Sequence, residues 1–360
     1  MNFRFSLYLD LLRFLAAIAV FVSHFAYTRF TDGDYIILRE LNIGSDAVVF
    51  FFVLSGLVIA YTAEVKDTTL KAYSFNRITR LYSVILPALI LTIILDLWGA
   101  HISPHVYDGW WYNATPVWEQ LFRGLTLSNS WFGESYRLGT NGPYWSLSYE
   151  AAYYILFGIM FYLSGFKRYL IALPLVFVFG FSVMLLFPVW LLGLWAYRQI
   201  RNQALPSLYA WPCAVFPPVI YILMLCAEIP KTLLLTTIGV LGEDFVSNNL
   251  FYSDEFIWNF IIAQLIVFHL IGMAALFEGG QGTAPDKIRM IIRWFAGATF
   301  TIYIVHYPAL QFADAVLPET WAPFYRHAVL FISVLVGCFL FAEISERRLK
   351  WIRRKLRLIS

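Results

Sequence analysis

Charged residues are scarce in this chain of 360 residues, and the scarcity excludes a typical soluble domain. Asp, Glu, Lys and Arg make up 14% of the sequence and hydrophobic residues 60%, with a mean hydropathy of +0.67. A soluble domain of this length carries about a quarter charged residues. The net charge of +3 is too small to indicate a nucleic-acid partner. The composition therefore indicates a protein embedded in a membrane.

Cysteine is scarce as well. Cys213, Cys226 and Cys338 all fall in apolar runs, which argues against a disulfide framework. His101 and His105 lack further ligands at metal-binding spacing, so no metal site is expected. The first apolar segment contains Arg13 and has no small-residue cleavage site after it, so it is not a cleavable signal peptide.

Long apolar stretches dominate the rest of the sequence. We expect about ten membrane spans, at 9–27, 45–64, 81–98, 145–164, 169–185, 187–199, 209–228, 256–277, 293–312 and 325–345. The fifth and sixth share one apolar run divided at Phe187-Pro188, and the stretch 232–241 is too short to span. The pattern predicts an all-α, polytopic transmembrane helical bundle that forms a single domain over residues 1–360.

The distribution of Lys and Arg predicts the orientation. With the N-terminus in the cytoplasm, 20 of the 26 Lys and Arg residues lie on the inner side. An even number of spans then places both termini in the cytoplasm. The basic segment 347–357 is expected to lie against the anionic inner leaflet.

Arg13 and His24 lie in the first span, and ionisable residues inside a span indicate a functional site. Eleven residues at about 100° each return to nearly the same helix face, and a rise of about 1.5 Å per residue separates the two by roughly 16 Å. One face therefore carries a cation near the inner surface and an imidazole near the outer surface. A snorkelling Arg and a hydrogen-bonded interfacial His are the alternative.

Three further ionisable residues are expected at the depth of His24. Asp46 begins the second span, Glu150 lies below the outer end of the fourth, and His306 lies in the outer third of the ninth. This predicts a polar pocket open to the outer side, with His24 as a base beside a carboxylate. A carboxylate is expected to lie closer to His24 than His306 does, because two imidazolium ions repel each other. His269 is expected to be a satisfied histidine of the bundle interior.

Arg77 and Arg80 precede the third span on the inner side. They share a face if this stretch is helical, and paired guanidiniums suit phosphate groups. With Arg13 at the same level, a phosphorylated cytoplasmic ligand competes with the simpler interpretation of positive-inside charge.

These residues also lie in blocks that resemble the acyltransferase-3 family of integral membrane acyltransferases, which includes bacterial polysaccharide O-acetyltransferases. The blocks are Arg13 with ten residues between it and His24, 44–56 around Asp46, Arg77 with Arg80, 145–150 from Trp145 to Glu150, 302–308 around His306, and 346–349. They occur in order and cover the chain. Many members carry an appended SGNH hydrolase-like domain, and none is expected here.

The resemblance implies a membrane-bound O-acyltransferase with acyl-CoA, most often acetyl-CoA, as the cytoplasmic donor. It implies a hydroxyl acceptor on an exported or cell-surface glycan or glycolipid, and a location in the bacterial plasma membrane. His24 would deprotonate the acceptor or carry the acyl group transiently, with Asp46 or Glu150 orienting it. The donor would be bound by the arginines Arg13, Arg77 and Arg80, and His306 and Trp145 would be further binding residues.

Two alternatives stay open. Another acyl group, such as succinyl, or another acceptor, such as a lipo-oligosaccharide or an antibiotic, is compatible with the same residues. A secondary transporter also places charge inside a bundle, but it more often shows internal repeats, which the sequence lacks.

Overall fold

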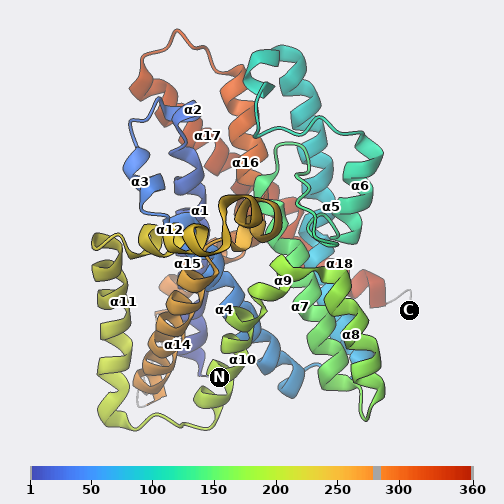
Figure 1. Cartoon of the computed structure of the whole chain (residues 1–360), viewed down its shortest axis with the longest axis vertical. Coiled ribbons are helices and arrows are strands. Elements are labelled where there is room, and N and C mark those ends of the chain that lie inside the picture. The colour runs from blue at the N-terminus through green and yellow to red at the C-terminus, as the bar shows by residue number, and fades with distance from the viewer. Residues whose placement is uncertain (1, 279–284, 358–360) are drawn as a thin grey trace.

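The computed structural model describes residues 2–278 and 285–357, and this part of the chain contains helices but no strand (Figure 1). The prediction of an all-α polytopic bundle is confirmed. The helices are α1 (Phe3–Phe25), α2 (Thr28–Thr31), α3 (Ile36–Glu40), α4 (Ile43–Val65), α5 (Leu70–Ile102), α6 (Val117–Thr126), α7 (Trp145–Tyr162), α8 (Lys167–Phe179), α9 (Phe181–Leu185), α10 (Phe187–Arg201), α11 (Ala210–Cys226), α12 (Ile229–Leu241), α13 (Glu243–Phe245), α14 (Phe256–Glu278), α15 (Asp286–Ala296), α16 (Thr299–Val316), α17 (Pro323–Ile344) and α18 (Leu349–Arg357).

The chain is an integral membrane protein, but its spans divide differently from the expected ten. Seven helical segments of the described chain are long and apolar enough to cross a membrane, and the pair α15 and α16, bent by 44°, makes an eighth if it is one span. The expected fifth span breaks at Gly180, where φ is +85°, and its second half continues into the sixth as the segment Phe181–Arg201. The stretch 232–241, which was predicted to be too short to span the membrane, belongs to α12, and this helix lies across the direction of α11 (Figure 1).

Helix α5 carries the arginine pair and shows how the sequence sets its start. The Thr69 side chain caps the helix by accepting a hydrogen bond from the Ala72 N–H, and 33 residues follow without a break despite Pro87. Arg77 and Arg80 are therefore one turn apart on a continuous helix, as the sequence predicted.

Glycines let α4 and α10 approach closely. A Cβ at Gly56 would lie 2.1 Å from the Trp190 carbonyl oxygen, and one at Gly193 would lie 2.0 Å from the Val53 carbonyl oxygen. Neither distance is compatible with a side chain, so small residues at these two positions permit the contact. This packing fixes α4 as one wall of the site described below.

The segment before α7 is packed inside the bundle. Leu138, Thr140, Asn141 and Tyr144 are all buried. Asn141 Nδ2 donates to the Ile304 carbonyl of α16 at 3.0 Å and to Thr92 Oγ1 of α5 at 3.1 Å. Because these hydrogen bonds hold the segment against both α5 and α16, α7 begins within the bundle, and its residues lie deeper than their positions in the sequence suggest.

Candidate functional site

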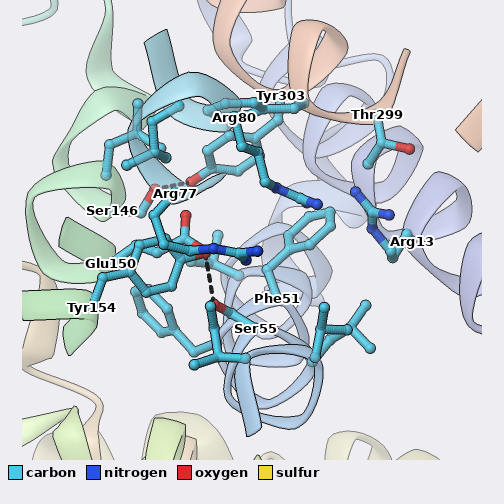
Figure 2. Close-up of a pocket in the computed structure, with 18 residues that line it drawn as sticks. Arg13, Phe51, Ser55, Arg77, Arg80, Ser146, Glu150, Tyr154, Thr299 and Tyr303 are labelled. Carbon is cyan, nitrogen blue, oxygen red and sulfur yellow. Dashed lines mark hydrogen bonds between the residues drawn. The ribbon is translucent and has the colours of Figure 1, made fainter. Parts of the chain in front are cut away.

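A cavity lies among α1, α4, α5, α7 and α16, and most of its polar side chains point toward one another (Figure 2). It brings together the three predicted arginines, one predicted carboxylate and several hydroxyl groups. Its principal lining residues are Arg13, Phe51, Ser55, Arg77, Arg80, Ser146, Glu150, Tyr154, Thr299 and Tyr303.

The three arginines give the cavity more positive than negative charge. Arg77 Nη2 lies 3.4 Å from Asp67 Oδ2, and Arg13 Nη1 lies 3.7 Å from Asp10 Oδ1. Arg80 forms no ion pair with any described residue, and Arg77 Nε is buried without a hydrogen-bond acceptor there. The cavity therefore presents guanidinium groups whose hydrogen-bonding capacity is only partly used, which suits an anionic ligand.

Glu150 lies in this cavity with the arginines, which corrects the expectation that it lies beside His24. Its Oε1 accepts hydrogen bonds from the Ser55 hydroxyl at 2.7 Å and from the Tyr154 hydroxyl, one turn further along α7. Trp190 Nε1 in turn donates to Ser55 Oγ at 3.2 Å. The depth of Glu150 was predicted wrongly because α7 begins inside the bundle.

His24 instead pairs with His306, so the expectation that a carboxylate lies closest is also wrong. His24 Nδ1 lies 2.8 Å from His306 Nε2, and the two rings are nearly parallel, with centroids 5.0 Å apart. Tyr27 stacks on the His24 ring at 5.7 Å, and Tyr307 meets it edge-on at 5.1 Å. The expectation considered only imidazolium ions, whereas two imidazoles attract when one donates and the other accepts.

Asp46 takes part in a separate network. Its carboxylate accepts hydrogen bonds from the Tyr221 hydroxyl at 2.8 Å and from Trp258 Nε1 at 2.7 Å, on helices α11 and α14. Each of its oxygens is thus bonded to a residue other than His24, and Asp46 also lines a mostly apolar pocket. His269 lies on the same side, with Nδ1 2.7 Å from the Ala214 carbonyl oxygen and Nε2 beside the Tyr8 hydroxyl, so both ring nitrogens have partners.

The cavity ends short of the histidine pair. Neither His24 nor His306 lines it, and Tyr303, one turn before His306 on α16, stands at its end with Phe51 edge-on at 5.6 Å. The Tyr303 hydroxyl pairs with Ser146 Oγ at 2.7 Å. Arg13 therefore lines this cavity and His24 does not, contrary to the expectation of one cavity shared by both.

Trp145 also lies outside the cavity lining. Its ring stacks on Tyr252 with centroids 4.6 Å apart and meets Tyr149 edge-on at 4.9 Å. A further contact joins the Trp145 and Phe52 rings, with centroids 6.0 Å apart, so Trp145 packs among aromatic side chains at the start of α7.

Sequence reasoning missed the hydroxyl groups that complete the site. Ser55 and Ser146 lie in the blocks 44–56 and 145–150, whose predicted site residues were Asp46, Trp145 and Glu150. Tyr154 follows Glu150 by four residues, a spacing that places two helical side chains on one face. Tyr303, three residues before His306, is likewise on the same helix face as a residue that the sequence singled out.

No cluster of His, Cys, Asp or Glu able to hold a metal ion occurs within residues 2–278 and 285–357.

A groove opens on the opposite side of the histidine pair. Aromatic and charged side chains line it, among them Arg29, His105, Trp111, Asp314, Trp321 and Arg326. The Arg29 guanidinium lies over the Phe30 ring at 3.8 Å and the Trp111 ring at 5.0 Å, and it donates to Gln311 of α16. Burial lowers the pKa of Arg29, and the neighbouring Tyr307 and Asp314 oppose this effect.

Arg29 connects the groove to the histidine pair. Its guanidinium carbon is 5.3 Å from the centre of the Tyr307 ring, and the edge of the same ring faces His24. The groove and the cavity thus approach the two histidines from opposite sides, one through Tyr307 and the other through Tyr303. A reaction between molecules entering from two sides is compatible with this arrangement.

Comparisons with known proteins agree with the sequence blocks. Residues 6–343 match the family described as "Acyltransferase domain". The chain is 33% identical over 156 residues to Acyltransferase MdmB of Streptomyces mycarofaciens, a match that covers 42% of this chain and 38% of that protein. The chain thus spans about two fifths of the length of that relative. No solved structure matches the chain.

Proposed function

We propose that this chain moves an acetyl group from cytoplasmic acetyl-CoA to a glycan hydroxyl. The proposal proceeds from the fact that the chain belongs to the acyltransferase family and is a membrane acyltransferase. The acceptor would be an exported or surface glycan or glycolipid, and the enzyme would act in a bacterial plasma membrane. The observation that carries the proposal is that Arg13, Arg77 and Arg80 all line one cavity. Arg13 lies on the same helix as His24, 11 residues before it, and His24 is paired with His306.

The arginine cavity supports a CoA donor. CoA carries phosphate groups on one end and a thioester on a slender, mostly apolar arm. Arg77 and Arg80 would bind the phosphates, which guanidinium groups can grip with two parallel hydrogen bonds. Phe51 and Tyr303 line the end nearest the histidines, which suits the arm and its thioester. Tyr303 would have to move for the thioester to reach His24.

His24 is proposed as the general base of the transfer. It would take the proton from the acceptor hydroxyl while that oxygen attacks the thioester carbonyl. The carbon–sulfur bond then breaks, an ester forms, and the proton on His24 passes to the CoA thiolate. Proton and acyl group balance in this sequence, and no metal or redox cofactor is needed. A transient acyl group on His24 would give the same products in two steps.

Glu150 is proposed to act on the donor side. Two hydroxyl groups hold its carboxylate in the cavity, where it offsets part of the charge of the arginines. A fixed negative charge beside bound phosphates weakens donor affinity but limits the sites where phosphate can lie. Its proposed role is to place the thioester arm, rather than to orient His24.

The groove on the other side of the histidine pair is the proposed approach of the acceptor. Its side chains combine the flat faces of Trp111 and Trp321 with the charged groups of Arg29 and Arg326. Aromatic faces with a few placed polar groups suit a sugar, which has apolar C–H faces and hydroxyl edges.

Mass spectrometry of surface glycans, with and without the protein, tests the proposal. Cells that express wild-type protein should carry acetylated glycan that cells with His24→Ala lack, at equal amounts of membrane-inserted protein. A succinyl or other acyl group would appear as a different mass difference and would correct the donor. Unchanged glycans in the wild-type and mutant strains would contradict a glycan acceptor.

A further inference from the structure

The second nitrogen of His306 determines how protons are distributed in the histidine pair. His306 Nδ1 lies 2.7 Å from the carbonyl oxygen of Ile302, one turn earlier on α16. A carbonyl oxygen can only accept, so Nδ1 of His306 carries the proton. In a neutral imidazole the other nitrogen is then an acceptor, and His306 Nε2 must receive its hydrogen bond from His24 Nδ1 at 2.8 Å.

The surroundings of the pair favour the neutral form of His306. Its side chain is fully buried, and its ring contacts are with Phe21, His24 and Tyr307. No carboxylate of the described chain forms an ion pair with His24 or His306. A buried imidazolium without a counter-ion costs far more than a neutral ring with both nitrogens bonded.

We infer that His306 is a positioning residue that fixes the tautomer of His24, holding the proton on Nδ1 and leaving the lone pair on Nε2. The inference deepens the proposed function, because it states which atom of His24 acts as the base. Within the described residues, Nε2 of His24 has no hydrogen-bond partner, whereas Nδ1 is bonded. The stacked Tyr27 and the edge-on Tyr307 hold the plane of the ring.

His306 thus does part of what an orienting carboxylate does for a catalytic histidine. It fixes the tautomer and the direction of the ring, and it is fixed in turn by the Ile302 carbonyl. It supplies no negative charge, so it cannot stabilise a His24 cation as a carboxylate does. This arrangement favours a proton that stays on His24 only briefly before it passes to the leaving thiolate.

The tautomer itself can be measured. We would label the full chain with ¹⁵N-histidine and purify it in detergent. Imidazole ¹⁵N spectra would then be recorded at a pH high enough for the rings to be neutral. The chain has six histidines, and the spectrum of His24→Gln identifies the His24 signals by their loss. We expect a protonated Nδ1 and an unprotonated Nε2 at His24. A protonated Nε2 in the wild-type protein would overturn the inference.

Two substitutions at position 306 separate positioning from packing. His306→Leu removes the acceptor, so His24 should change to the form protonated on Nε2. His306→Gln places an amide oxygen near the position of the lost Nε2 and should restore the wild-type tautomer. His327→Leu is the matched control, because His327 is also buried against aromatic rings, and it should leave the His24 signals unchanged.

Transfer rates should follow the tautomer. The initial rate of surface-glycan acetylation should fall about a hundredfold in His306→Leu, within the range of general-base effects, and recover to within about tenfold of wild type in His306→Gln. The thermal stabilisation by added CoA should not change in either variant. If both variants lose equal activity with an unchanged His24 tautomer, His306 is a packing residue and the inference is wrong.

The experiment distinguishes this inference from the proposed function. Full activity in His24→Ala would contradict the proposed base, whatever the tautomer. A wild-type His24 protonated on Nε2, together with an inactive His24→Ala, would contradict only the role of His306. Should His306→Leu fail to fold, the wild-type spectrum and His306→Gln still decide the question.

Discussion

The arginine cavity and the histidine pair share the helices α1 and α16 but differ in how their polar groups are satisfied. Helix α1 contributes Arg13 to one and His24 to the other, and α16 contributes Tyr303 and His306. In the cavity, donor groups of the arginines have too few acceptors. In the pair, each imidazole has a protein partner. The first arrangement needs a charged ligand to complete it, whereas the second keeps its geometry without one.

The largest expected effect is at His24. His24→Ala should lower acyl transfer by at least about a thousandfold, because it removes the proposed base from a site that otherwise remains intact. The CoA-dependent rise in thermal midpoint should remain, since the cavity lining does not include His24. Transfer would be measured as surface-glycan acetylation, and stabilisation by thermal unfolding with added CoA. Loss of both signals together would show that the two regions are not separable.

At Arg80 the expected effect is on donor binding. Arg80→Gln should weaken CoA binding by roughly ten- to a hundredfold, the value of one or two charge-assisted hydrogen bonds. Arg198→Gln is a matched control, because Arg198 is exposed in the last turn of α10 and does not line the cavity. Titration of purified protein with CoA, followed by thermal unfolding, measures both. Equal weakening in the two variants would contradict a specific phosphate site.

Substitution of Glu150 should separate affinity from rate. Glu150→Gln removes a negative charge from the cavity, so CoA should bind a few-fold more tightly. Transfer at saturating donor should fall by about tenfold, because the Ser55 and Tyr154 hydroxyls lose the charged acceptor that fixes the cavity wall. Weaker CoA binding would instead indicate that Glu150 contacts the donor directly.

The smallest effect on transfer is expected at Asp46. Asp46→Asn should change the rate by no more than about twofold, because its carboxylate is bonded to Tyr221 and Trp258 and not to His24. It should lower the thermal midpoint by a few degrees, since the amide can accept only one of the two hydrogen bonds well. A loss of transfer as large as that of His24→Ala would return Asp46 to the catalytic set.

The sequence predicted the arginine cavity better than the surroundings of His24. Arg13, Arg77 and Arg80 were placed together because spacing along continuous helices and the inside bias of positive charge determine their depth. Glu150 was placed too far out, because nothing in its own helix reveals that residues 138–144 enter the bundle first. The depth of a residue depends on where its helix begins, and tertiary hydrogen bonds such as those of Asn141 set that point.

The histidine pair shows a second limit. Depth alone correctly gave His24 and His306 a common level, but charge repulsion was used to predict that a carboxylate lies closer to His24 than His306 does. The Ile302 carbonyl makes His306 an acceptor toward His24. It is a backbone group, so the residue types in the sequence do not reveal this role. Which of two side chains approaches a histidine was therefore not predictable from residue types.

The contact between α18 and α5 bears on how the enzyme is made. Arg353 donates to the Thr79 hydroxyl at 2.9 Å and to the Asn76 carbonyl at 2.7 Å, on the turn of α5 that bears Arg77 and Arg80. These partners lie 274 and 277 residues apart in the chain. During synthesis, α5 must wait in the membrane while all the intervening helices are inserted. Its arginines gain this support only after residue 353 has left the ribosome, so the arginine cavity of a nascent chain lacks it until α18 has been made.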